Sequence, residues 1–175
     1  MRHIICVLFL VGLIGLIAGK ARADEFRNVQ CGAPIPKALI GQRTSDERVV
    51  AIENRYKALG LKDLGADEIS DRLSSISWLI CGGEYMLLVD RGVVRDVLPF
   101  PPHSKAAPAF SGRCQRAAKD LPDVIVAVLN FKPGAEPLTP AAAWTIDQAH
   151  ARFVALPTEG LLCPRSGIIT ADGGT

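Results

Sequence analysis

The sequence predicts an α+β fold, in which N-terminal helices pack on a mainly antiparallel β-sheet that is stapled by disulfide bonds. Two observations lead to this prediction. Apolar residues recur at helical spacing only near the start of the chain, and short aliphatic runs separated by glycine- and proline-rich turns follow from residue 76 onward. The chain lacks the regular alternation of strands and helices that a doubly wound parallel sheet needs.

The first 23 residues have the layout of a secretory signal peptide. A positively charged head precedes the apolar run Ile4–Ala18, and the small-residue site Ala21–Ala23 follows it. We expect cleavage before Asp24, which removes residues 1–23 and leaves residues 24–175 as a single exported domain. A retained membrane anchor is the alternative, but the apolar run is shorter than the roughly 20 residues of a spanning helix. The mature protein is therefore expected in a periplasm or outside the cell, without a stable membrane span.

Removal of this segment also changes the charge of the chain. The full sequence has a formal net charge of +2. Cleavage removes three basic residues and no acid, which leaves −1; the residues lost are Arg2, Lys20 and Arg22. No long block of lysine or arginine remains, so the electrostatic signature of a nucleic-acid-binding protein is missing. We expect no nucleic-acid partner.

Four cysteines follow the signal segment, at Cys31, Cys81, Cys114 and Cys163. An even number of widely spaced cysteines in an exported chain predicts two disulfide bonds. Three pairings are possible, and we expect Cys81–Cys114 with Cys31–Cys163, because the second bond would tie the two ends of the domain together. A zinc site is the alternative, but no two cysteines have the C-x-x-C spacing. No metal site and no cofactor are expected.

Two helices are predicted before residue 76. Thr44 and Glu47 have the spacing of a capping box, and Gly60 stands where a C-terminal glycine belongs. The apolar stripe of this first helix consists of Val49, Ile52, Tyr56 and Leu59. A second, shorter helix is expected over Asp67–Ser75, with acidic residues at its positive N-terminal end.

The rest of the chain has the composition of strands. The expected strands are Trp78–Ile80, Tyr85–Val89, Val93–Leu98, Val124–Leu129, Ala143–Ile146, Arg152–Leu156 and Leu161–Cys163. Asp90–Gly92 is expected to form a hairpin turn, and residues 147–150 a second one. The proline-rich stretches 98–112 and 130–142 are expected to be irregular.

Catalytic signatures are scarce. No G-x-S-x-G elbow, P-loop, dinucleotide fingerprint or H-E-x-x-H pair is present. Glu84 follows two glycines, but a general acid needs a positioned partner, so we expect Glu84 to be solvated at the edge of a hairpin. Asp147 and His150 are close in sequence and are expected to be polar residues of a turn. We predict no catalytic residues.

The function expected from these observations is a small exported binding or inhibitory module, which acts on an unknown protein or glycan through loops on a rigid sheet. The candidate ligand-binding residues are Arg91 at a hairpin tip, His103 in the proline-rich loop, and the aromatic Trp144. Two alternatives stay open. One is an exported hydrolase that uses Glu84, Asp147 or His150; the other is a structural envelope protein, for which an exposed strand edge or a large apolar patch would be the sign.

Overall fold

The computed structural model of this protein describes residues 23–169. Residues 1–22, and with them nearly all of the predicted signal peptide, lie outside the described residues. In the part that is described, none of the helices has both the length and the apolar character that crossing a membrane requires.

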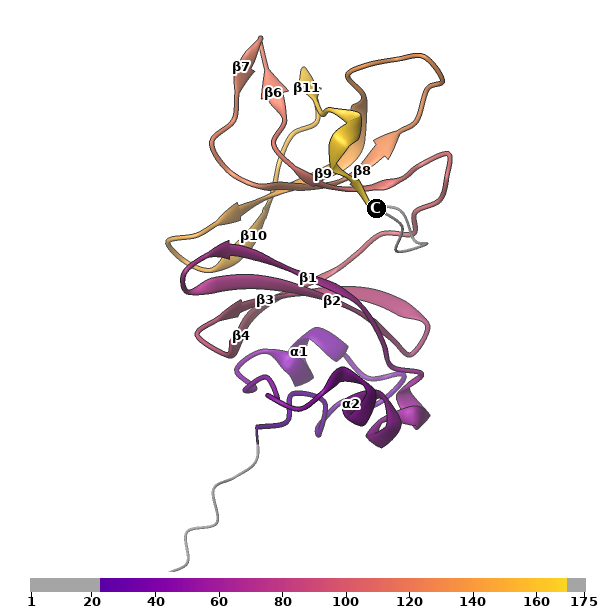
Figure 1. Cartoon of the computed structure of the whole chain (residues 1–175), viewed down its shortest axis with the longest axis vertical. Coiled ribbons are helices and arrows are strands. Elements are labelled where there is room, and N and C mark those ends of the chain that lie inside the picture. Colours follow the sequence, from indigo (N-terminus) through magenta and orange to yellow (C-terminus); the bar gives the residue numbers. More distant parts are fainter. Residues whose placement is uncertain (1–22, 170–175) are drawn as a thin grey trace, which may run out of the picture.

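The described chain consists mostly of β-strands, which form three antiparallel sheets (Figure 1). Strands account for 46% of the structure and helices for 12%. The predicted α+β class is therefore wrong. The difference arises because several strands are too short or too exposed to carry the alternating apolar pattern by which a strand is recognised.

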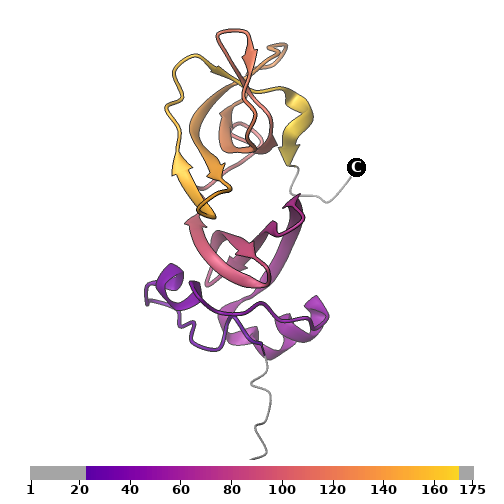
Figure 2. The same cartoon turned by 90° about the vertical axis from the view of Figure 1, so that its left-hand side faces the viewer.

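A four-stranded meander forms the first sheet, in the order β1-β2-β3-β4. Its strands are β1 (Lys62–Ser70), β2 (Leu73–Ile80), β3 (Gly83–Asp90) and β4 (Val93–Pro99). Three short helices pack on one face of this sheet: α1 (Ile35–Leu39), α2 (Val49–Arg55) and the 3-10 helix η1 (Lys57–Leu59). Figure 2 shows the helices, the curled sheet and the remaining strands stacked along the long axis of the molecule.

The second half of the chain forms a five-stranded sheet, in the order β10-β9-β8-β5-β12, and a three-stranded sheet, in the order β11-β6-β7. The strands of the larger sheet are β5 (Ala109–Gly112), β8 (Ile125–Asn130), β9 (Thr139–Asp147), β10 (Arg152–Ala155) and β12 (Ile168–Ile169). Those of the smaller sheet are β6 (Gln115–Arg116), β7 (Lys119–Asp120) and β11 (Leu161–Leu162). The 3-10 helix η2 (Arg165–Gly167) precedes β12.

Period-two alternation gives the first sheet two different faces. Ile76, Trp78 and Ile80 of β2 face the helices, where Trp78 packs edge-on against Phe26 with ring centroids 5.1 Å apart. The other face packs on the five-stranded sheet through Leu88 and its apolar neighbours. This inter-sheet core contains Leu73, Met86, Leu88, Leu98, Phe100, Val126, Val128 and Ile146.

The two disulfide bonds join Cys31 to Cys81 and Cys114 to Cys163. The expected pairing of Cys81 with Cys114 and of Cys31 with Cys163 is therefore wrong. It assumed that a bond would tie the two ends of one domain together. Instead, the first bond ties the segment before α1 to the β2–β3 turn, and the second lies within the second half of the chain. The two disulfides suggest an oxidising, exported environment.

The predicted capping box at Thr44 does not form, because α2 begins later, with Arg48 at its N-cap. The residues before it are held by distant parts of the chain. The backbone N–H of Thr44 donates to the carbonyl of Gly92 at 3.0 Å, and that of Ser45 donates to the Glu25 carboxylate at 2.8 Å. The glycine at the end is confirmed: Gly60 caps η1 in the left-handed conformation, with φ of 58°.

The predicted helix over Asp67–Ser75 is also wrong, because these residues form the β1–β2 hairpin. Asp67 pairs with Ser75, and Ser70 pairs with Leu73 across the turn. Only two apolar residues support the helix that was expected, whereas pairing with β2 satisfies the backbone along the whole stretch.

The predictions for the later strands are largely confirmed. Asp90 pairs with Val93, and the turn residues Arg91 and Gly92 have φ of 51° and 73°, as a tight hairpin turn requires. β8 is buried between β5 and β9, as expected for a central strand. The stretches 98–112 and 130–142 are not wholly irregular, because they contain β5 and the start of β9. Pro140 lies in β9 beside a register shift, where a strand tolerates proline.

Candidate functional site

The two larger sheets close on each other at one side and stand apart at the other. At the closed side, the Phe153 N–H of β10 donates to Oδ2 of Asp96 on β4 at 2.7 Å. A second link lies between the turns, where the Arg72 guanidinium donates to the carbonyl of Gln148 at 2.7 Å. Aliphatic and aromatic side chains fill the closed side. Toward β1 the same face becomes polar, and a cleft opens.

This cleft has a volume of about 470 Å³. Residues 62–67 of β1 form one wall, and Ser75 and Ser77 of β2 line it further in. Glu84 and Met86 of β3, together with His103, Ala109 and Ile169, complete it. The lining mixes carboxylates, hydroxyls and apolar groups, so polar groups for hydrogen bonding stand beside apolar surface.

Glu84 and His103 form a hydrogen-bonded pair in the cleft, with Oε2 and Nε2 2.7 Å apart. Two contacts position them. The Phe100 N–H donates to the Glu84 carbonyl at 2.9 Å, and the Phe100 ring packs edge-on against the His103 ring, with centroids 5.7 Å apart. The expectation that Glu84 is solvated without a partner is wrong, because the partner comes from a loop 19 residues further along the chain. That distance in sequence hides the pair from any local motif.

Ser75 is the most enclosed polar residue of the cleft, with 6% of its surface exposed. It pairs with Asp67 on one side and with Leu88 on the other, so its side chain projects between the sheets. Among the residues that the structure describes, its hydroxyl has no hydrogen-bond partner. A hydroxyl that lines a cleft without a partner can form a hydrogen bond to a bound ligand.

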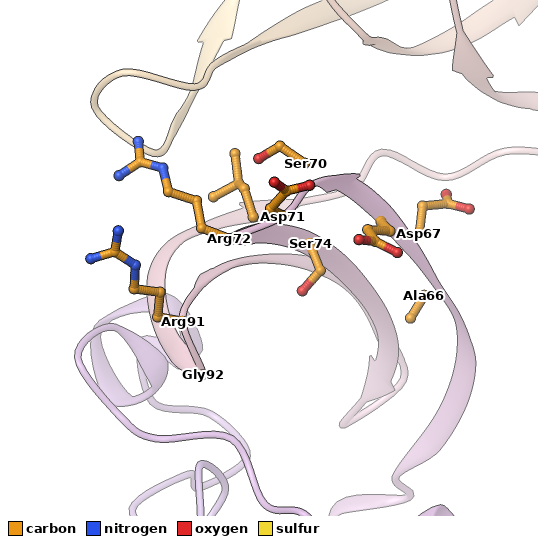
Figure 3. A pocket seen from close by; sticks show the side chains of 10 residues that line it. Ala66, Asp67, Ser70, Asp71, Arg72, Ser74, Arg91 and Gly92 are labelled. Carbon is orange, nitrogen blue, oxygen red and sulfur yellow. The ribbon is translucent and has the colours of Figure 1, made fainter.

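A second hollow, of about 410 Å³, lies at the end of β1 near the two hairpin turns (Figure 3). Arg91, predicted as a ligand-binding residue, lines it together with Arg72 and Asp67. In Figure 3 the guanidinium groups of Arg72 and Arg91 lie near each other at one end. Arg72 is 3.6 Å from the Asp90 carboxylate, so part of its charge is already compensated.

The structure does not bring the three predicted ligand-binding residues together. His103 lies in the cleft and Arg91 at the turn-side hollow. Trp144 lies in β9, partly buried against the inter-sheet core, with its ring centroid 6.3 Å from that of Phe100. A ligand-binding role for each of the three stays a prediction.

Asp147 and His150 meet at the β9–β10 turn, away from the cleft. His150 Nδ1 is 2.9 Å from Asp147 Oδ2, and Arg152 donates to the same oxygen at 3.0 Å. These hydrogen bonds lower the pKa of the Asp147 carboxyl, and the bond to His150 has the largest effect. The His150 side chain is 70% exposed, and neither residue lines the cleft that contains Glu84. The three residues of the predicted hydrolase therefore do not converge.

A further group of polar residues lies under the helices. Glu25 is 3% exposed, and burial raises the pKa of its carboxyl. Burial and a hydrogen bond to Asp24 raise the pKa of Tyr56 to about 12. Neither Glu25 nor Tyr56 lines the cleft or the turn-side hollow, and we assign them to the attachment of the N-terminal segment.

Comparison of the chain with known protein families, with curated proteins and with solved structures gave no match. The function is therefore argued from the geometry of the cleft.

Proposed function

We propose that this protein is an exported binding or inhibitory module that holds its partner in the cleft between the four-stranded and the five-stranded sheet. The observation that carries the proposal is the cleft itself, which opens beside β1 and is lined by Ser75, whose hydroxyl has no hydrogen-bond partner among the described residues. Each half of the scaffold carries its own disulfide bond. Such a scaffold presents a pre-formed site, which lowers the entropy cost of binding.

Binding is better supported than hydrolysis. In the cleft, Glu84 is occupied by His103, and the two other residues of the hydrolase alternative lie at a distant turn. Among the described residues, no group of three or more histidine, cysteine or acidic side chains is placed to hold a metal ion that could activate water. The cleft thus offers recognition groups without an evident nucleophile and base in contact.

The alternative of a structural envelope protein is favoured by one observation, the exposed edge of β1. An open edge can pair with a strand of another chain and so build an assembly. In that case the protein itself would associate as its concentration rises, whereas a binding module stays monomeric until its partner is added. Light scattering over a range of concentrations distinguishes the two.

The proposal is tested by filling the cleft. Ser77→Trp places a large ring inside it, and the control Ser74→Trp makes the same change on the opposite face of β2. A displayed peptide library and an oligosaccharide array serve as probes for the wild-type protein. We expect selected ligands to lose about tenfold or more in affinity for the Ser77 variant, a difference of about 1.4 kcal/mol, and to keep their affinity for the control. The proposal is contradicted if the selected ligands bind the Ser77→Trp variant with unchanged affinity, or if no ligand is selected.

A further inference from the structure

The two edges of the four-stranded sheet differ in how they are covered. The backbone of β4 is capped by the segment before α2: the Gly41 N–H donates to the Val94 carbonyl at 2.8 Å, and the Val94 N–H donates to the Gln42 carbonyl at 2.9 Å. At the other edge, in the described part of the chain, β1 has backbone–backbone hydrogen bonds to β2 alone, and carboxylates accept from two further N–H groups: Asp63 N–H donates to Glu53 at 2.9 Å and Gly65 N–H to Asp63 at 3.2 Å. These contacts occupy the start of β1, so the strand edge that is left open beside the cleft runs over residues 66–70.

The open edge has features that suit an incoming strand. Residues 64–68 are all exposed, and Gly65 and Ala66 carry little side chain to obstruct an approach. Leu64 and Ile169 also line the cleft, and they are 40% and 41% exposed. Apolar side chains of a bound segment could cover them, since alternate residues of an added strand point to the same face.

The charge of the edge defines the partner further. Between Lys62 and Asp71 the chain carries four carboxylates, Asp63, Asp67, Glu68 and Asp71, against the single lysine. Asp67 and Glu68 have no ion-pair partner among the described residues. Natural edges are often protected from aggregation by charged side chains, and lysine is the usual choice. An acidic edge instead attracts a basic segment.

A second copy of this chain fits the edge poorly. Two β1 strands paired with each other would bring acidic side chains of both copies together, and like charges across a strand pair are destabilising. A basic segment from another protein avoids this repulsion. Ser75, opposite Asp67 in the β1–β2 pairing, lines the cleft, and its hydroxyl can form a hydrogen bond with one side chain of the segment.

We propose that the partner of the cleft is an extended basic peptide segment, which adds to β1 as a fifth strand of the first sheet and places alternate side chains in the cleft. This inference rests on the proposed function, because it names the occupant of the same site. Main-chain pairing with β1 supplies affinity, and the acidic side chains with Ser75 supply selectivity.

The probe is a synthetic peptide of about eight residues with alternating lysine and valine, long enough to match a strand of this length. Binding to the full mature protein is measured by calorimetry, and the contact surface by amide chemical-shift changes in NMR. We expect the shifts to concentrate in β1 and in the cleft. A matched glutamate–valine peptide should bind about tenfold or more weakly, and added salt should weaken binding of the lysine peptide.

Two further comparisons separate strand addition from attraction by charge. N-methylation of every second peptide residue removes the N–H donors from one edge of the peptide strand only. Two such peptides are made, one methylated at the odd and one at the even positions; one of them should lose binding to β1 and the other should keep it. Asp67→Lys with Glu68→Lys should abolish binding, whereas Asp46→Lys with Glu159→Lys, which makes the same change in net charge at exposed sites elsewhere, should have little effect. Circular dichroism confirms that each variant is folded.

Several outcomes would overturn the inference. It fails if both N-methylated peptides bind equally, or if the glutamate peptide binds as well as the lysine peptide. It also fails if light scattering shows that the protein associates with itself through β1. If library ligands occupy the cleft while the lysine peptide does not, the inference fails and the proposed function stands. If neither the libraries nor the peptide gives a cleft ligand, both fail.

Discussion

At the scale of single residues, the polar contacts of the molecule join residues that are far apart in the sequence. Glu84 meets His103 in the cleft, and the Ser45 N–H meets the buried Glu25 carboxylate under the helices. His103 was predicted to bind a ligand because it lies in a proline-rich loop. The sequence could not predict its partner, because a loop of unknown course separates the two.

Tyr56 offers a direct test of the residue contacts at the start of the described chain. Its pKa of about 12 arises first from burial and then from its hydrogen bond to Asp24. Because the raised pKa means that the folded state holds the proton more tightly, its contribution to stability is full below about pH 10 and is lost as the pH rises toward 12. We expect Asp24→Asn to lower the pKa of Tyr56.

The measurement is a spectroscopic titration of tyrosinate in the Tyr85→Phe background, which leaves Tyr56 as the single tyrosine. If the pKa of Tyr56 is the same with Asp24 and with Asp24→Asn, the two side chains are not in contact in solution.

At the scale of elements, predictability depended on burial. The hairpin of β3 and β4 and the central strand β8 could be predicted, because aliphatic runs and turn glycines mark them. β1 could not, since an exposed edge strand has no apolar alternation and its Asp67–Glu68 pair imitates the start of a helix. The cleft that β1 borders was equally hidden, because it depends on how two sheets meet.

A hydrogen bond between β4 and β10 joins the two larger sheets. Asp96→Ala removes the acceptor of the Phe153 N–H, so this donor loses its partner at the closed side of the cleft. We expect a loss of about 1–3 kcal/mol in the free energy of unfolding, measured by urea denaturation. The neighbouring Arg95 is exposed, and Arg95→Ala should change stability by less than about 0.5 kcal/mol. Equal effects of the two substitutions would show that Asp96 does not join the sheets.

At the scale of the whole molecule, each disulfide bond closes its own part of the chain. The sequence predicted that the four cysteines would pair, but spacing does not determine which thiols meet in three dimensions. The bonds Cys31–Cys81 and Cys114–Cys163 follow from the course of the N-terminal segment around the first sheet and of the C-terminal segment beside β6.

This connectivity can be checked by mass spectrometry of peptides released without reduction. We expect fragments that link Cys31 to Cys81 and Cys114 to Cys163. Replacing Cys31 and Cys81 together by alanine should lower the free energy of unfolding by about 4 kcal/mol, because the unfolded chain regains the freedom of a loop of about 50 residues. A fragment that joins Cys81 to Cys114 would contradict the arrangement described here.

The order of these bonds along the chain has a consequence for biogenesis. Along the described chain, the first cysteine is bonded to the second and the third to the fourth, so the two loops are consecutive and do not interleave. A chain that enters an oxidising compartment with its N-terminus first presents Cys31 and Cys81 before Cys114 emerges. Oxidation in order of arrival therefore yields the native bonds directly, without a disulfide isomerase to correct them.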